Sequence, residues 1–172
     1  WDRLLEFPVK EPHEFVDRLE ALWKKGKGMG DFSELVAITK EPDNYKRTVV
    51  GIILKILGIK GGVDLSMDTE IPLGSGLGSS AAFSLACAAA ISKAYGMELP
   101  RERINQLAFE AERLVNGNPS GADNTACCYG GIMHFQRGEP NIIKPVEFHP
   151  EVQDGFLLVM SRTHKRSTGE LV

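Results

Sequence analysis

The sequence has few of the residues that build disulfide frameworks and zinc sites. Its cysteines are Cys87, Cys127 and Cys128, and no two of them have C-x-x-C spacing. An odd cysteine count without that spacing argues against both a disulfide-stapled fold and a zinc centre. The four histidines are scattered, with no H-x-x-x-H pair. We therefore expect reduced thiols and a cytoplasmic protein.

Long apolar runs and an excess of basic residues are also missing. The most apolar stretch covers residues 81–91, which is too short to cross a bilayer. The formal net charge of the 172 residues is −3, so the charge balance favours neither a nucleic-acid partner nor an anionic membrane. Hydrophobic residues make up 42% of the chain, which is typical of a soluble globular domain.

Glycine, in contrast, is concentrated in PLGSGLGSSAA at residues 72–82. The preceding residues 62–71 alternate apolar and polar side chains, which predicts a half-buried strand, and small residues at 79–96 predict a helix. A glycine turn between a strand and a helix is typical of phosphate binding, because the N–H groups at a helix N-terminus lack partners. A tight turn packed beneath a neighbouring helix is the alternative.

Two common glycine motifs do not fit this stretch. A Walker loop needs Gly-Lys-Ser/Thr, but Gly78 is followed by Ser79 and Ser80. A dinucleotide fingerprint needs G-x-G-x-x-G, whereas these glycines lie at alternate positions.

The rest of the chain mixes helices and strands, which predicts an α+β fold. Helical spacing is found at 13–24, 44–58 and 101–117, and a short helix ends at 128. KKGKGMG at 24–30 is interpreted as a solvated turn. Further strands are predicted at 132–136, 142–148 and 156–160.

Residues 72–82 resemble the second motif of the GHMP kinases, P-x-G-x-G-L-G-S-S-A-A, at every position. PSGADN at 119–124, YGG at 129–131 and the terminal KRSTGELV are most similar to the mevalonate kinase branch. The resemblance spans roughly residues 45–172. It implies a mixed sheet packed against helices, with residues 1–150 as a partial N-terminal ATP-binding domain and 151–172 as the start of a C-terminal domain.

The resemblance implies ATP and Mg²⁺ as cofactors. The phosphates of ATP would be wrapped by the loop Gly74, Ser75, Gly76, Leu77, Gly78, Ser79 and Ser80. Ser80 and Glu112 would be ligands of Mg²⁺. From the residues alone, Ser79 or Ser80 could instead cap the helix. Periodicity also leaves Glu110 and Glu112 equivalent, on opposite sides of the apolar stripe.

By the same resemblance, Asp123 would be the catalytic base that takes the proton of the attacking hydroxyl. Taken alone, Ser120 and Asp123 have the S-x-x-D spacing of a capping box, so Asp123 could simply close a helix. Substrate-positioning residues would be Ser120, Asn124, Arg166 and Thr168.

The function expected from the resemblance is ATP-dependent phosphorylation of a small-molecule alcohol, foremost the 5-hydroxyl of mevalonate in isoprenoid synthesis. A sugar kinase of the same family and a non-catalytic nucleotide-binding module are the alternatives, and a homodimer stays open. The family's N-terminal lysine motif P-G-K-x-x-x-x-G-E-H and its C-terminal glycine-rich motif do not occur in 1–172. We therefore expect a fragment of a longer kinase that turns over poorly alone.

Overall fold

The computed structural model describes residues 4–9, 12–71, 76–138 and 141–147 of the chain. Within these ranges, six helices and four strands occur in the order β1 (Leu4–Val9), α1 (Pro12–Met29), α2 (Ser33–Thr39), α3 (Pro42–Ile56), β2 (Val63–Asp68), α4 (Ser79–Ala94), α5 (Arg101–Asn116), α6 (Ala122–Tyr129), β3 (Met133–Gln136) and β4 (Ile142–Pro145). The predicted α+β class is confirmed. None of the described helices is both long and apolar enough to span a membrane.

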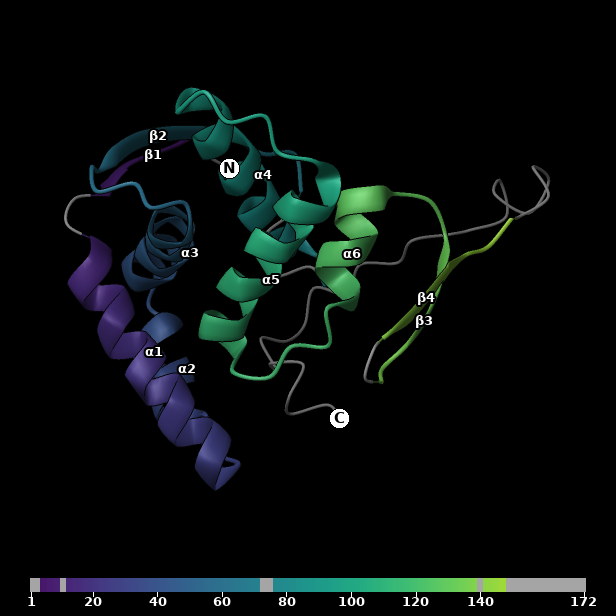
Figure 1. Cartoon of the computed structure of the whole chain (residues 1–172), viewed down its shortest axis with the longest axis horizontal. Helices are drawn as coiled ribbons and strands as arrows, with labels where there is room; N and C mark the ends of the chain where they lie inside the picture. The colour runs from purple at the N-terminus through teal and green to yellow at the C-terminus, as the bar shows by residue number, and fades with distance from the viewer. Residues whose placement is uncertain (1–3, 10–11, 72–75, 139–140, 148–172) are drawn as a thin grey trace.

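The core is formed where α3, α4 and α5 pack against one another, with α1 on the outer side of α3 (Figure 1). Ala81, Ser84 and Ala88 of α4 are fully buried, and such small side chains let neighbouring helices approach closely. The apolar stripe predicted on α5 also faces the core, and its buried members are Leu107, Ala108, Ala111, Leu114 and Val115.

The described strands form two antiparallel ribbons. In the first, β1 pairs with β2 so that Val9 lies opposite Val63. The predicted alternation of β2 is confirmed, because its apolar side chains, Val63, Leu65 and Met67, pack against the core. In the second ribbon, β3 pairs with β4, so these residues do not by themselves assemble a single mixed sheet.

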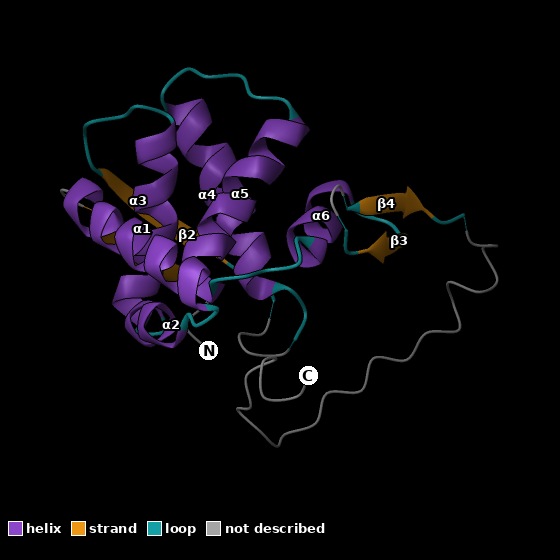
Figure 2. Ribbon diagram, turned by 60° about the horizontal axis from the view of Figure 1, so that its bottom comes forward, coloured by secondary structure: helices purple, strands orange, loops and turns teal. Residues whose placement is uncertain are grey.

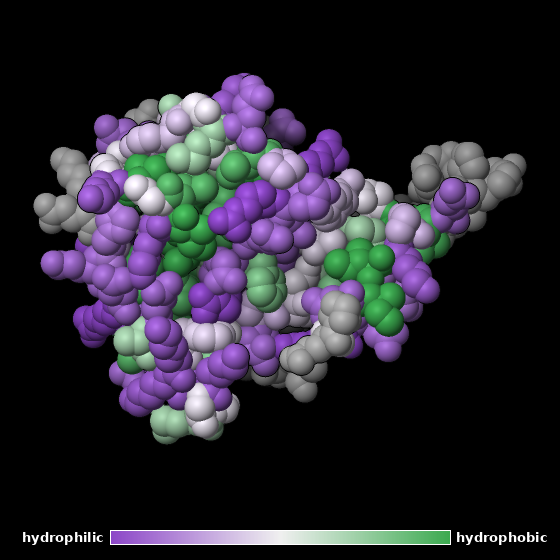
Figure 3. Space-filling view, in the orientation of Figure 1, coloured by the Kyte–Doolittle hydropathy of each residue, from purple (hydrophilic) through white to green (hydrophobic). Residues whose placement is uncertain are grey.

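The β3–β4 ribbon extends away from the helical body beyond α6 (Figures 1 and 2). Every residue of β4 is exposed, including Ile142 and Ile143. Figure 3 shows apolar side chains gathered on this ribbon, apart from the apolar surface of the helical body. The ribbon therefore has little of the packing that stabilises the helices.

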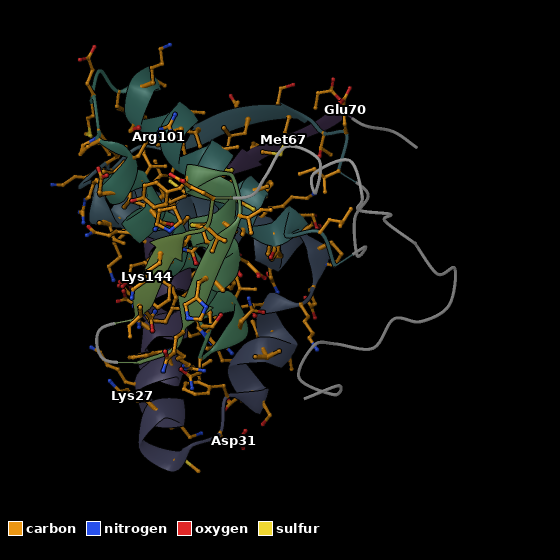
Figure 4. The ribbon with its side chains drawn as sticks, turned by 90° about the vertical axis from the view of Figure 1, so that its right-hand side faces the viewer. Lys27, Asp31, Met67, Glu70, Arg101 and Lys144 are labelled. Atoms are coloured by element: carbon orange, nitrogen blue, oxygen red, sulfur yellow. The ribbon has the colours of Figure 1, made fainter. Side chains whose placement is uncertain are left out.

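The prediction of a solvated turn at 24–30 was wrong, because α1 continues to Met29. Gly26 is buried within this helix, and a Cβ there would lie 2.6 Å from the Asp31 carbonyl oxygen. Glycine at position 26 therefore allows the backbone that follows the helix to pass close against it. Gly30, with φ of +69°, follows the end of the helix, where Lys27 and Asp31 lie (Figure 4). The strand predicted at 156–160 lies outside the described residues.

Candidate functional site

Four helix ends meet around one pocket of about 570 Å³. Figure 4 places Arg101, the first residue of α5, at the end of the molecule opposite Lys27 and Asp31. The other end of α5 reaches the pocket together with the start of α4, the start of α6 and the end of α2. We call it the acidic pocket, and its lining includes Lys40, Ser80, Glu112, Asn116, Ser120, Asp123 and Asn124.

The described part of the glycine loop turns directly into α4. Gly76 and Gly78 have φ of +75° and +69°, values that favour glycine. Gly78 is the N-cap of α4, and no side chain caps this helix in the described part of the chain. The sequence left open whether Ser79 or Ser80 caps this helix, and in the structure neither side chain does so. Gly74 and Ser75 lie outside the described residues.

Glu112 is the buried carboxylate of the acidic pocket, with an exposed fraction of 6%. Ser84 Oγ donates to its Oε1 at 3.3 Å, and Asn116 Nδ2 donates to its Oε2 at 2.6 Å. Burial raises the pKa of Glu112, while hydrogen bonds from Ser84, Ser80 and Asn116 oppose that rise. Ser80 and Glu112, separated by 32 positions in the sequence, thus line the same pocket.

Glu110 occupies a different environment. Its Oε2 accepts a hydrogen bond of 2.7 Å from Arg113 Nε, and the guanidinium group of Arg113 lies over the ring of Trp23 at 4.0 Å. Of the two acids that periodicity left equivalent, only Glu112 lines the acidic pocket.

Asp123 lies in the first turn of α6, exposed, on the lining of the acidic pocket. The N-cap of α6 is Gly121, with φ of +85°, and the described residues provide no side-chain cap. The capping box considered from the sequence is therefore not formed. Ser120 Oγ instead accepts a hydrogen bond from the backbone N–H of Ala122 at 3.2 Å.

The structure gathers five of the residues selected from the sequence in the acidic pocket, namely Ser80, Glu112, Ser120, Asp123 and Asn124. Asn124 is buried, and its Nδ2 donates to Asn105 Oδ1 at 2.6 Å. Arg166 and Thr168 lie outside the described residues.

Sequence reasoning missed the residues that support this pocket. Ser84 and Asn116 each lie four residues beyond a predicted metal ligand on the same helix, so helical spacing could have indicated them. Lys40 belongs to no recognisable sequence motif, and only the folded structure shows that it lines the pocket.

A second pocket of about 400 Å³ adjoins the first and shares Lys40 and Ser80 with it. We call it the aromatic pocket, because the rings of Tyr45 and Phe83 lie 5.5 Å apart in it. The Tyr45 hydroxyl donates to the Ser80 carbonyl oxygen at 3.3 Å. Burial raises the pKa of Tyr45, which keeps this phenol protonated.

The donor set around Glu112 fits Mg²⁺ bound together with phosphates. The Ser80 hydroxyl and the Glu112 carboxylate are hard oxygen donors on the lining of one pocket. Mg²⁺ commonly takes one or two protein ligands, while phosphates and waters complete its shell. The described residues contain no group of three or more His, Cys, Asp or Glu that could hold a metal by itself. The arrangement therefore suits a metal that arrives with a nucleotide.

Comparison with known proteins gives a family match and a set of named relatives. Residues 44–131 match the model of the GHMP kinases N terminal domain. The mevalonate kinase of Thermococcus sibiricus is 36% identical over 104 residues, which are 60% of this chain and 31% of that protein. The mouse mevalonate kinase is 37% identical over 125 residues, covering 64% of this chain and 30% of that protein. The chain thus spans less than a third of the length of these curated relatives.

Solved structures lead to the same fold. The crystal structure of L. major mevalonate kinase in complex with R-mevalonate matches with a TM-score of 0.56 and 30% identity, over 64% of this chain and 35% of that chain. The Methanococcus jannaschii mevalonate kinase matches with a TM-score of 0.52 at 24% identity, over 64% of this chain and 34% of that chain. The second likeness supports the fold alone.

Proposed function

This chain belongs to the GHMP kinase family, and we propose that the protein transfers a phosphoryl group from ATP to the hydroxyl of a small-molecule alcohol. The observation that carries the proposal is the convergence of Ser80, Glu112 and Asp123 on one pocket at the start of α4. These three residues come from distant parts of the sequence and from three helices. They supply the groups that phosphoryl transfer needs, which are metal ligands and a base beside a phosphate-binding helix N-terminus.

Each group has a distinct role in the proposed reaction. Backbone N–H groups of residues 74–80 bind the phosphates, helped by the positive end of α4. Ser80 and Glu112 hold Mg²⁺, which when bound neutralises phosphate charge. Asp123 accepts the proton of the attacking hydroxyl, and its exposed carboxylate on the pocket lining suits that role.

Ser120 and Asn124 position the acceptor in this proposal, together with Arg166 and Thr168. Ser120 lines the same pocket as Asp123, and Asn124 is held by its hydrogen bond to Asn105. We assign residues 1–150 to the N-terminal ATP-binding domain and 151–172 to the start of the C-terminal domain. The family match at 44–131 supports the first of these assignments.

Mevalonate is the acceptor we propose, with its 5-hydroxyl as the attacking group. Support comes from the curated relatives, which carry the name mevalonate kinase, and from the L. major enzyme, whose structure was solved in complex with R-mevalonate. ADP release is measured with mevalonate, with galactose and without an acceptor. Release that depends on mevalonate supports the assignment, whereas release that depends on galactose would favour a sugar kinase.

The phosphate and metal assignments are tested by calorimetry of Mg·ATP binding to the 172-residue chain. Glu112→Gln should weaken binding about tenfold or more in the presence of Mg²⁺, because one metal ligand loses its charge. Asp123→Asn should leave binding nearly unchanged and lower turnover about 100-fold or more. Glu110→Gln is the matched control on the same helix and should change neither.

Two results would count against the proposal. A folded chain that does not bind Mg·ATP would leave the glycine stretch as a structural turn. Equal weakening by Glu110→Gln and Glu112→Gln would show a general effect of charge rather than a metal ligand.

A further inference from the structure

Lys40 lies where the two pockets meet. It lines the acidic pocket together with Glu112 and Asp123, and it lines the aromatic pocket together with Tyr45 and Phe83. Ser80 is the other residue common to both described linings. A ligand that extends from one pocket into the other therefore passes beside Lys40 and Ser80.

The backbone that carries Lys40 is firmly held. Lys40 is the C-cap of α2, and its N–H donates to the Val36 carbonyl oxygen at 3.0 Å. The preceding Thr39 is fully buried, and its hydroxyl lies 3.0 Å from the Val115 carbonyl oxygen on α5. After it, Asn44 Nδ2 donates to the Ile38 carbonyl oxygen at 3.1 Å and so holds the turn between α2 and α3. Because this backbone is already ordered, little further backbone entropy is lost when the lysine pairs with an anion.

The charge of Lys40 is available to a ligand. In the described lining of the acidic pocket, Lys40 is the sole cation, and the same lining contains two acidic residues, Glu112 and Asp123. No hydrogen bond or ion pair joins its ammonium group to another described residue. The second lysine of the aromatic pocket, Lys46, differs because its ammonium group lies 3.7 Å from Asp43. A lysine ammonium binds phosphate as a point charge and needs no exact orientation.

We infer that Lys40 is a phosphate-binding residue, whose ammonium group pairs with a nucleotide phosphate beside Ser80 at the junction of the two pockets. The inference rests on the proposed function, because it assumes that a nucleotide is the ligand. It adds a protein cation to the metal as a source of positive charge for the phosphates. It also predicts that Lys40 contributes more to the binding of ATP than to the binding of adenosine.

The test compares Lys40→Met, Lys40→Arg and Lys46→Met in the 172-residue chain. Calorimetry measures the binding of Mg·ATP and of adenosine, and thermal unfolding checks that each variant is folded. Lys40→Met should weaken Mg·ATP binding about tenfold, the usual size of a lost charge-assisted contact, and should leave adenosine binding unchanged. Lys40→Arg keeps the charge and should bind Mg·ATP within about twofold of the unaltered chain. Lys46→Met controls for the general loss of a nearby positive charge and should have the smaller effect.

The outcomes separate this inference from the proposed function. Equal weakening of ATP and adenosine by Lys40→Met would overturn it, because a structural defect affects both ligands. Unchanged Mg·ATP binding in Lys40→Met, alongside weakened binding in Glu112→Gln, would overturn it and leave the proposed function standing. An equal loss in Lys46→Met would overturn the assignment to Lys40. Failure of the unaltered chain to bind Mg·ATP would overturn both.

Discussion

The acidic pocket is built from two regions of opposite character. Its wall is centred on Glu112, which is buried on α5 and accepts hydrogen bonds from Ser84 of α4, behind the pocket, and from Asn116 at the end of α5. Its rim is formed by Lys40 and Asp123, which are exposed at the end of α2 and the start of α6. The wall is held by contacts within the protein, whereas the rim faces the space that a ligand would enter.

The buried residues of the wall therefore stabilise the pocket, whereas the exposed residues of the rim are the ones that can act on a ligand. Among the described residues, no buried side-chain nitrogen or oxygen lacks a hydrogen-bond partner, so the polar wall is satisfied within the protein. Loss of a partner in the wall leaves a buried polar group unpaired, which costs free energy of folding. Loss of an exposed group at the rim costs little stability and acts mainly on ligands.

The largest effect on stability is expected from Gly117→Ala, at the end of the helix that carries Glu112 and Asn116. Gly117 has φ of +77°, and a Cβ there would lie 2.5 Å from the Cβ of Phe32. The strained backbone and the clash together should lower the free energy of unfolding by about 3 kcal/mol, measured by denaturant titration. Gly96→Ala, with φ of +72° and open space, controls for the backbone alone and should cost about 1 kcal/mol. Equal costs would show that packing against Phe32 contributes nothing.

A smaller effect should separate two serines one helical turn apart. Ser84→Ala removes a donor to Glu112 in the wall and should cost about 1 kcal/mol of unfolding free energy. Ser80→Ala acts where the loop meets the helix, at a residue that is only partly buried, so it should cost less stability than Ser84→Ala but weaken Mg·ATP binding. Denaturant titration measures the stability of both variants, and calorimetry measures their Mg·ATP binding. The same pattern of changes in both would contradict the distinction between a serine that supports Glu112 and one that acts on the ligand.

The sequence was sufficient to predict the elements whose patterns are local. The alternation of β2, the small residues of α4 and the apolar stripe of α5 each predicted an element that the structure confirms. Their burial follows directly from a period of two or of 3.6 residues. The motif residues Ser80, Glu112 and Asp123 could likewise be selected, although only the fold shows that they share a pocket.

Features that depend on distant partners could not be predicted in this way. β1 was missed because its pairing partner, β2, comes after three intervening helices, and α2 was missed as well. The glycines at 24–30 indicated a turn, but Gly26 lies inside α1, where Asp31 and Phe32 approach it closely. Periodicity could not separate Glu110 from Glu112, because the contact that occupies Glu110 involves Arg113 packed on Trp23 of a different helix.

The smallest effect expected is a difference in thiol reactivity that leaves the fold unchanged. Cys87 is buried in α4, and burial raises its pKa to about 12, so at pH 8 it remains a protonated and unreactive thiol. Cys127 is exposed, and its Sγ lies 3.8 Å from the Gly78 carbonyl oxygen at the glycine loop. A thiol reagent should modify Cys127 and Cys128 in the native chain and reach Cys87 only in denaturant.

Cys128→Ser should remove one of the two accessible thiols, and bound Mg·ATP should slow the reaction of the other. If Cys87 were modified as fast as Cys127, the helices that bury Cys87 would have to open easily in the native protein. That result would contradict the view that the wall of the pocket is closed while its rim is open.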